Sequence, residues 1–268
     1  MGAAIALATL DAGALAPGDL LVLEPDPARF PPLAERSVAC FTSPESARDA
    51  LARAEAAPGD AMILLAVKPQ SLDAVAAQLR PVLEIPRLIL SILAGATLAR
   101  LAGALGSRHR IVRAMPNTPA RIRRGVTAIC PSPHVASDDL QRARAVLSPL
   151  GEAHLLPESL MDAFTALVGS GPAYLFYLTE CLAHAARAAG FAPDLAESLS
   201  RATVVGAAAL LDAEPERSPA SLRASVTSKG GTTEAACRVL DDAGLREIFV
   251  RAILAARDRG RELSVPPG

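Results

Sequence analysis

The chain has 268 residues, of which 51% are hydrophobic, 3% are aromatic and 21% are charged, with a net charge of -1. This length favours two domains of ordinary size. The near-neutral charge gives no electrostatic reason to expect a nucleic acid or an anionic membrane as a partner, so we expect a small-molecule substrate.

The N-terminus is apolar, but it does not predict export or a lipid anchor. Asp11 interrupts the apolar run and the first basic residue is Arg29, whereas a signal peptide begins with a positive region. Ala6 stands where a myristoylation signal has Ser or Thr. No apolar run approaches the ~18 residues of a spanning helix. We therefore expect a cytoplasmic protein.

The cysteines are scattered, without a CxxC pair and without a His at ligand spacing. This pattern predicts buried free thiols and no metal site. The four residues are Cys40, Cys130, Cys181 and Cys237.

Residues 1–157 alternate short apolar runs with helical patterns. The expected strands are 20–23, 37–41, 62–66, 88–93, 111–114, 126–130 and 153–156, and the expected helices include 2–13, 44–56, 70–82, 97–105 and 137–147. Such alternation is typical of a mostly parallel, doubly wound sheet covered by helices on both faces.

Residues 158–268 carry only helical patterns. The expected helices are 160–189, interrupted by a proline kink at GSGP (169–172), and 193–213, 218–224, 232–242 and 245–263. Their Ala- and Leu-rich faces exceed what one subunit can bury, which predicts a dimer interface.

Three expected strands end in loops of unusual composition: VKPQ (67–70), AGAT (94–97) and MPNTP (115–119). Ligands of open α/β sheets bind where loops leave the carboxyl ends of the strands. Each loop alone is equally compatible with a simple turn that carries helix-capping residues. Their coincidence on successive strands favours a ligand cleft.

The segment SLRASVTSKGGTTEAACRVLDDAG (221–244) places hydroxyls and two glycines directly before a helix. The free amides and the dipole of a helix N-terminus attract anions, so this loop predicts a site for a carboxylate or a phosphate. The simpler alternative is an ordinary helix cap completed by Glu234, for which one hydroxyl would be enough.

This segment resembles the signature of the pyrroline-5-carboxylate reductases. AVKPQ (66–70), LAGAT (93–97), MPNTP (115–119) and GSGPAY (169–174) are similar to that family's other landmarks, in the same order. The resemblance implies a Rossmann-like dinucleotide-binding domain (1–157), an all-helical substrate and dimerisation domain (158–268) that forms a homodimer, and an active site between the two. It also implies reduction of 1-pyrroline-5-carboxylate to L-proline with NADPH or NADH, the last step of proline biosynthesis.

The resemblance also assigns roles to residues. Ser228 and the amides of Gly230, Gly231 and Thr232 would hold the substrate carboxylate, and Thr233 would face the imine nitrogen as the catalytic residue. Ser43 would lie at the adenosine side of the cofactor and Ser225 near the nicotinamide. The remaining cofactor residues would be Gly2, Glu24, Ala66, Val67, Lys68, Pro69, Ala94, Gly95 and Asn117. Lys68 could instead be a solvated surface lysine.

Two positions bear on substrate and cofactor preference. Lys229 stands where the family usually has proline, which loosens the loop and adds a charge beside the carboxylate site. Glu24, at a strand end, would bond the ribose hydroxyls of NADH and repel the 2′-phosphate of NADPH. Because Arg29 lies close enough to offset this repulsion, we expect only a mild preference for NADH.

In the family, a strand and a GxGxxG turn precede the first helix, and Met1-Gly2 aligns with the end of that turn. We therefore expect a sheet without its first strand, and a start codon assigned too far downstream. One alternative is a non-catalytic or impaired relative of the same fold. Another is a β-hydroxyacid-type dehydrogenase, which would need a catalytic lysine in the helical domain, where Lys229 is the only lysine. The GSG at 169–171 is not a hydrolase elbow.

Overall fold

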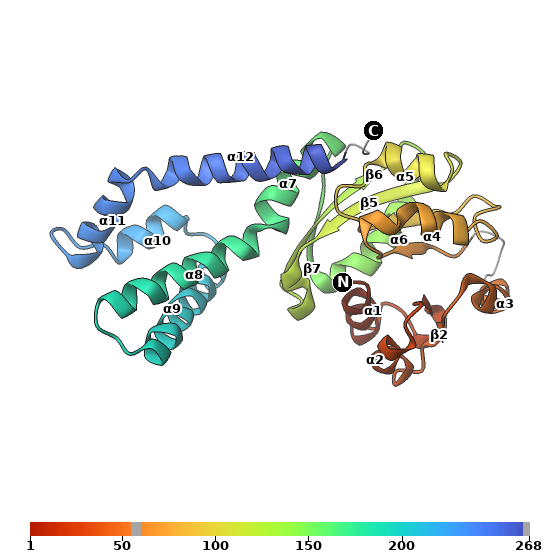
Figure 1. Ribbon diagram of the computed structural model, residues 1–268, viewed down its shortest axis with the longest axis horizontal. Coiled ribbons are helices and arrows are strands. Elements are labelled where there is room, and N and C mark those ends of the chain that lie inside the picture. Colours follow the sequence, from red (N-terminus) through yellow and green to blue (C-terminus); the bar gives the residue numbers. More distant parts are fainter. Residues whose placement is uncertain (55–59, 265–268) are drawn as a thin grey trace. The chain divides into compact units, whose positions relative to one another are not determined.

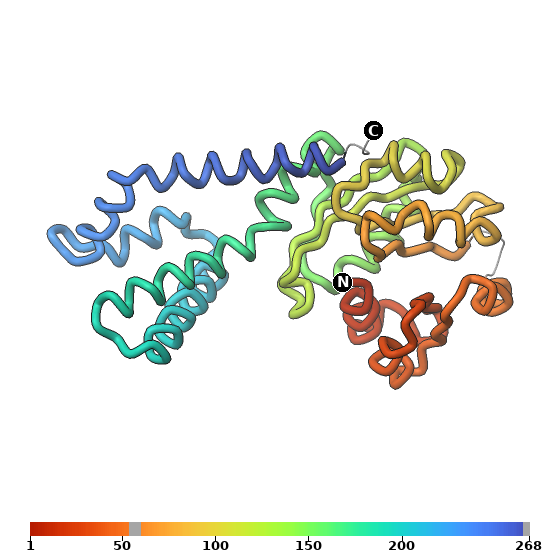
Figure 2. Tube along the Cα trace, in the orientation of Figure 1, coloured from red at the N-terminus to blue at the C-terminus, as the bar shows by residue number. Residues whose placement is uncertain are grey.

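The computed structural model describes residues 1–54 and 60–264, and the chain forms two compact units (Figure 1). The first unit comprises Met1–Gly169 and Arg257–Gly268, and the second comprises Ser170–Ala256. The first unit extends beyond residue 157 because Met161 packs in one buried cluster with Ala128 and Cys130 of the sheet. Figure 2 follows the chain through both units to its C-terminal helix, whose last residues return to the first unit.

The strands of the first unit form two sheets. The smaller sheet pairs β1 (Leu21–Leu23) with β2 (Ala39–Phe41), and the larger has the order β3-β4-β5-β6-β7. These five strands are β3 (Ile63–Leu65), β4 (Leu88–Ser91), β5 (Arg110–Pro116), β6 (Gly125–Pro131) and β7 (Gly151–Leu155). Every pair is parallel except β5 with β6. Within the described ranges no strand joins the two sheets, and the pairing confirms the expected mostly parallel arrangement.

Helices cover both faces of the five-stranded sheet. On one face, α1 (Gly2–Asp11) and α6 (Ser137–Leu147) pack on β4, β5 and β6 through a core that includes Ile5, Leu90 and Leu147. On the other face, α4 (Leu72–Gln78) and α5 (Leu98–Leu105) pack on β3, β4 and β5. This arrangement confirms the doubly wound fold.

The helices differ from the expected ranges mainly at prolines and at their ends. The expected helix 70–82 is shorter because Pro69–Ser71 forms a 3-10 turn before α4. The short helix α2 (Pro31–Ala34) is not among the expected elements. Its two prolines fit the first turn of a helix, where a backbone N–H would have no acceptor within the helix. α3 covers Pro44–Ala54, and the last residues of the expected helix 44–56 lie outside the described part.

The helical part begins with the 3-10 turn Glu158–Leu160 and α7 (Met161–Phe164), followed by a π-helical turn at Thr165–Gly169. Helix α8 then starts at Gly171 with Pro172 in its first turn, so the expected interruption is confirmed. The remaining helices are α8 (Gly171–Ala188), α9 (Pro193–Ala213), α10 (Pro219–Ser225), α11 (Thr232–Asp242) and α12 (Leu245–Ser264).

The second unit buries little of its apolar surface. Within residues 170–256, all of which the structure describes, the only buried residues are Ala183, Ala196 and Ser200. Large apolar side chains of α8, α9, α11 and α12 are exposed, among them Phe176, Tyr177, Val205, Val239 and Val250. A single chain therefore leaves the apolar excess that the sequence indicated.

Candidate active site

Three of the expected cofactor loops lie at one edge of the five-stranded sheet. β3, β4 and β5 are adjacent and parallel, so their carboxyl ends, at Ala66, Ile92 and Asn117, meet at the same edge. Val67, Lys68 and Pro69 follow β3 and are exposed, and Ala94, in the loop after β4, is exposed as well.

Two glycines at this edge are required by geometry. A Cβ on Gly2, in the first turn of α1, would lie 2.8 Å from the Ala66 Cβ, so only glycine lets α1 approach the end of β3. Gly95 has a φ of +74°, a backbone conformation that L side chains rarely adopt. The N-terminus of α1, which has no side-chain cap, therefore lies beside the exposed end of β3.

The acid expected near the ribose follows β1. Glu24 Oε2 lies 3.5 Å from Arg29 Nη1, and Glu24 Oε1 accepts a hydrogen bond of 3.1 Å from the amide of Asp26. Arg29 is thus placed to offset the negative charge of Glu24. Ser43 follows β2, and its Oγ accepts a hydrogen bond of 3.3 Å from the Ser46 amide at the start of α3.

The side chain of Asn117 is engaged within the protein. It is 8% exposed, its Nδ2 donates to Val168 O at 3.2 Å, and its Oδ1 accepts from the Val126 amide at 2.9 Å. Asn117 therefore ties the end of β5 to β6 and to the π-helical turn. Both ends of the side-chain amide are thus engaged within the protein.

The Ser/Thr- and Gly-rich loop lies in the second unit, between α10 and α11. The Gly230 amide donates to Glu234 Oε2 at 2.7 Å, and the Gly231 amide donates to Ser228 O at 3.0 Å. Glu234 thus caps the loop in the manner of the simpler alternative. Helix α11 starts at Thr232 without a side-chain cap, and its first backbone hydrogen bond runs from Ala235 to Gly231. The amides of Thr232 and Thr233 therefore make none of the helix's own hydrogen bonds.

The hydroxyls of this loop divide into two groups. Those of Ser225 and Thr227 donate to the carbonyl oxygens of Leu222 and Arg223, each at 2.7 Å. Ser228 is exposed beside Gly231, where an added Cβ would collide with its Oγ. Thr233 is half-buried.

A cluster of ionised side chains next to the end of loop 94–97 was not predicted from the sequence. Arg113 of β5 is 4% exposed, and its guanidinium lies 3.0 Å from Glu158 Oε1 and 3.7 Å from Asp162 Oδ1. An arginine within an apolar strand is a signal of such a cluster, because a buried charge needs partners.

Among the described residues, no group of three or more His, Cys, Asp or Glu could hold a metal ion. No helix among them is both long and apolar enough to cross a membrane.

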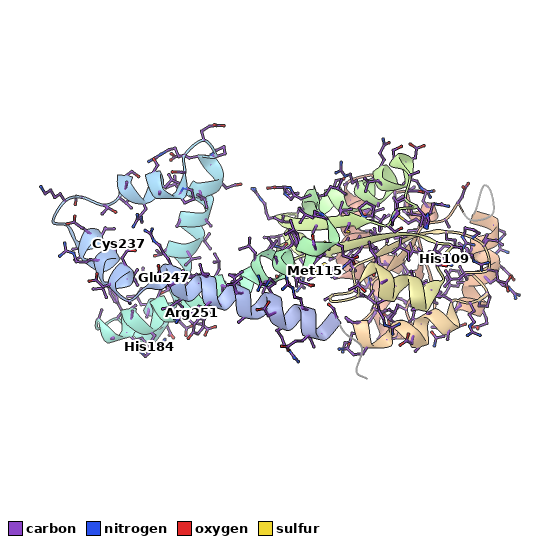
Figure 3. The ribbon with its side chains drawn as sticks, turned by 90° about the horizontal axis from the view of Figure 1, so that it is seen from above. His109, Met115, His184, Cys237, Glu247 and Arg251 are labelled. Carbon is purple, nitrogen blue, oxygen red and sulfur yellow. The ribbon has the colours of Figure 1, made fainter. Side chains whose placement is uncertain are left out.

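His109, labelled in Figure 3, is 2% exposed and its Nδ1 accepts a hydrogen bond of 3.2 Å from the Arg87 amide. Burial lowers the pKa of His109, and the charges of Arg108, Arg87 and Arg110 lower it further.

The expectation of buried thiols holds only in part. All four cysteines are free; Cys130 is buried, Cys40 and Cys237 are partly buried, and Cys181 is exposed. Burial raises the pKa of the Cys130 and Cys40 thiols. Cys181 is exposed because it lies on α8, much of whose apolar surface is open in the single chain.

Comparison with known proteins identifies the family. Residues 158–263 match the family model described as pyrroline-5-carboxylate reductase dimerisation. A pyrroline-5-carboxylate reductase of Synechocystis is 41% identical, with 92% of this chain and 89% of that protein covered. The Escherichia coli protein of the same name is 32% identical, with 98% of this chain and 95% of that protein covered.

Solved structures agree with this result. The chain is similar to a pyrroline-5-carboxylate reductase from Coxiella burnetii, with a TM-score of 0.84, 34% identity, and 98% of this chain and 96% of that chain covered. A Plasmodium falciparum pyrroline carboxylate reductase, solved with NADP bound, has a TM-score of 0.80 and 26% identity, with 99% and 95% covered. The chain belongs to the pyrroline-5-carboxylate reductase family.

Proposed function

We propose that this chain reduces 1-pyrroline-5-carboxylate to L-proline by hydride transfer from NADPH or NADH, as the last step of proline biosynthesis. The observation that carries the proposal is the 41% identity to a pyrroline-5-carboxylate reductase across 92% of the chain. Family membership favours this reaction over that of a β-hydroxyacid-type dehydrogenase. The one lysine that such an enzyme could use, Lys229, lies exposed in the loop before α11.

The edge formed by β3, β4 and β5 fits a nicotinamide cofactor. Its loops present small residues and a positive-φ glycine, and the uncapped N-terminus of α1 beside it suits a phosphate. The residues that would hold the cofactor are Gly2, Glu24, Ser43, Ala66, Val67, Lys68, Pro69, Ala94, Gly95, the backbone of Asn117, and Ser225. When bound, the cofactor supplies the hydride.

Glu24 supports a mild preference for NADH, because a carboxylate repels a 2′-phosphate. Arg29, 3.5 Å from Glu24, limits this repulsion. The ratio of kcat/KM with NADH to that with NADPH tests the preference. A Glu24→Gln variant should shift this ratio toward NADPH, and an unchanged ratio would remove Glu24 from the cofactor site.

The loop before α11 supports binding of the substrate carboxylate. The Ser228 hydroxyl, the Thr232 amide and the positive end of the helix dipole all favour an anion there. The amides of Gly230 and Gly231 are engaged with Glu234 and Ser228, so a substrate carboxylate would take the place of Glu234 at Gly230. The exposed Lys229 adds a positive charge to the same loop.

Thr233 would donate a hydrogen bond to the imine nitrogen. Loss of this donor should cost about 1–3 kcal/mol of transition-state binding, equivalent to a fall of about 5- to 150-fold in kcat/KM. Thr233→Ala tests this role, with Thr233→Ser expected to retain most of the activity. Thr227→Val is the matched control, because its hydroxyl donates to Arg223 O within α10. Full activity of Thr233→Ala would refute the assignment.

The exposed helices of the second unit and the match to a dimerisation family support a homodimer, for which the sequence predicts a cytoplasmic location. The purified chain should oxidise NADH or NADPH with the cyclic imine as acceptor. If neither cofactor turned over, the chain would be a non-catalytic relative of the same fold.

A further inference from the structure

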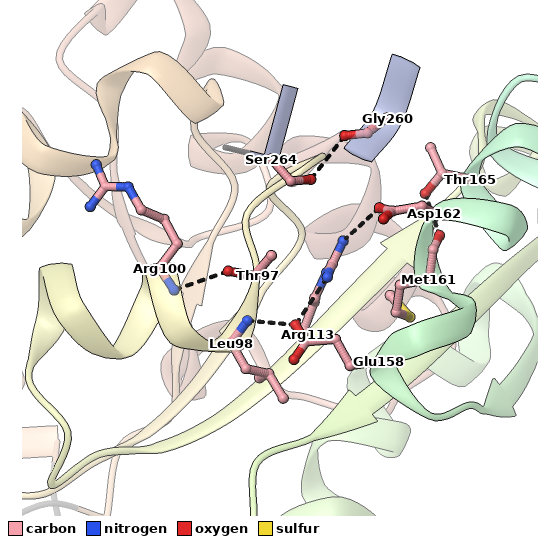
Figure 4. Close-up of polar contacts among 10 residues, drawn as sticks. All are labelled: Thr97, Leu98, Arg100, Arg113, Glu158, Met161, Asp162, Thr165, Gly260 and Ser264. Atoms are coloured by element: carbon pink, nitrogen blue, oxygen red, sulfur yellow. Dashed lines mark hydrogen bonds and ion pairs between the residues drawn. The ribbon is translucent and has the colours of Figure 1, made fainter. Parts of the chain in front are cut away.

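A buried arginine of the first unit contacts two carboxylates, one of which also binds the start of α5, directly after loop 94–97. Arg113 lies in β5, in register with Ser91 of β4 and Cys130 of β6, and its side chain is 4% exposed. A charge buried on a sheet is costly unless it is paired. Arg113 is paired with two carboxylates, Glu158 and Asp162 (Figure 4).

Glu158 links the arginine to the cofactor loop. Its Oε1 accepts a hydrogen bond of 3.0 Å from Arg113 Nη1 and another of 2.6 Å from the Leu98 amide. Leu98 is the first residue of α5, and Thr97 caps the same helix by accepting a hydrogen bond of 3.1 Å from the Arg100 amide. The carboxylate of Glu158 thus lies at the positive end of α5, where it also satisfies a free amide.

The end of α12 lies beside Asp162 and beside Gly95 of the same loop. A Cβ on Gly260 would lie 3.7 Å from Asp162 Cβ, and a Cβ on Gly95 would lie 3.7 Å from Ser264 Oγ. Asp162 contacts Arg113 and this end of α12. In contrast to Glu158, it forms no hydrogen bond to α5 among the described residues.

We propose that Glu158 is a positioning residue for the cofactor: paired with Arg113, it accepts the hydrogen bond from the Leu98 amide and so fixes the backbone of loop 94–97. This inference rests on the proposed role of Ala94 and Gly95 in cofactor binding. Because Gly95 has no Cβ, the loop can take other conformations besides the one with φ of +74°, and the anchored start of α5 selects one of them. A loop that is ordered before the cofactor arrives binds it more tightly, with little effect on the chemical step.

The test compares Glu158→Gln, Glu158→Ala and Asp162→Asn in the full-length protein. Gln keeps an acceptor for Leu98 but loses the charge, and Ala loses both. We expect the KM for NADPH and NADH to rise about threefold in Glu158→Gln and about tenfold in Glu158→Ala, with kcat within about twofold of wild type. Asp162→Asn removes a carboxylate from the same arginine without touching α5, so its cofactor KM should stay near the wild-type value.

A second measurement does not depend on turnover. Hydrogen exchange of the peptide that spans residues 94–101, in protein without cofactor, should be faster in both Glu158 variants than in wild type and Asp162→Asn. Unchanged exchange at this peptide in Glu158→Ala would overturn the proposal. So would an equal rise in cofactor KM in Asp162→Asn and Glu158→Gln, because the effect would then be general destabilisation.

These outcomes separate the inference from the proposed function. If wild-type protein neither turns over the imine nor binds NADPH or NADH in an isothermal calorimetric titration, the proposed function fails. If wild-type protein is active and the Glu158 variants match it in cofactor KM and in exchange, only the positioning role fails.

Discussion

Substitution of Asn117 tests whether its side chain stabilises the fold or binds the cofactor, because its amide forms hydrogen bonds within the protein. Asn117→Ala removes the hydrogen bonds to Val168 O and from the Val126 amide, at 3.2 and 2.9 Å. Each bond contributes about 1 kcal/mol net, and the Val126 amide loses its acceptor at a half-buried site. We therefore expect the free energy of unfolding of the first unit to fall by about 2–3 kcal/mol.

Urea denaturation at one fixed protein concentration, without cofactor, measures this change. Thr118→Ala is the matched control, because Thr118 is the exposed neighbour and should lie within about 0.5 kcal/mol of wild type. Asn117→Ala that retained wild-type stability but raised the cofactor KM would refute the reasoning. The amide would then serve the cofactor and not the packing of β5.

Three further predictions follow from single residues. The folded state disfavours protonated His109, because the pKa of His109 is lowered on folding. The free energy of unfolding should therefore be constant above about pH 7 and fall by up to about 1.4 kcal/mol per pH unit below about pH 6.5. His109→Asn, which keeps an acceptor for the Arg87 amide, should flatten this slope, and an unchanged slope would mean that another group causes the pH dependence. Gly230 has a φ of +72° with open space around it, so Gly230→Ala should strain the loop by about 1 kcal/mol and raise the KM for the imine. Gly230→Asn should raise this KM less, because Asn tolerates positive φ better than Ala. Equal KM values for the two variants would contradict this reasoning. Cys181 should react with a thiol reagent faster as the protein is diluted, and a rate independent of protein concentration would place it outside the interface.

Sequence patterns located those parts of the fold that short-range chemistry determines. Helix α11 begins at Thr232 and ends at Asp242, as expected, because the glycine pair and hydroxyls mark its start. β5 is longer than the apolar run 111–114, since Arg110 and Pro116 pair with the neighbouring strands whatever their side chains. Strand length there depends on partners that a local pattern does not contain.

The candidate site was predictable to a similar extent. The loops at the strand ends were found because small residues and prolines follow apolar runs. The engagement of Asn117 and the role of Glu158 were missed, because their partners lie 51 and 45 residues away in sequence. Glu158 follows a proline in an ordinary polar segment, and only the position of Arg113 in space gives it a function.

The two sides of the proposed site depend on different sources of stability. The cofactor loops follow strands of a sheet that has its own core on both faces. The substrate loop connects α10 and α11, neither of which has a buried residue in the single chain. Helices without a fully buried residue gain little stability from packing within the chain, so we expect a second subunit to add order to this loop. We therefore expect oligomerisation to stabilise the proposed substrate loop more than the proposed cofactor loops, because the exposed apolar faces and the substrate loop occur in the same unit.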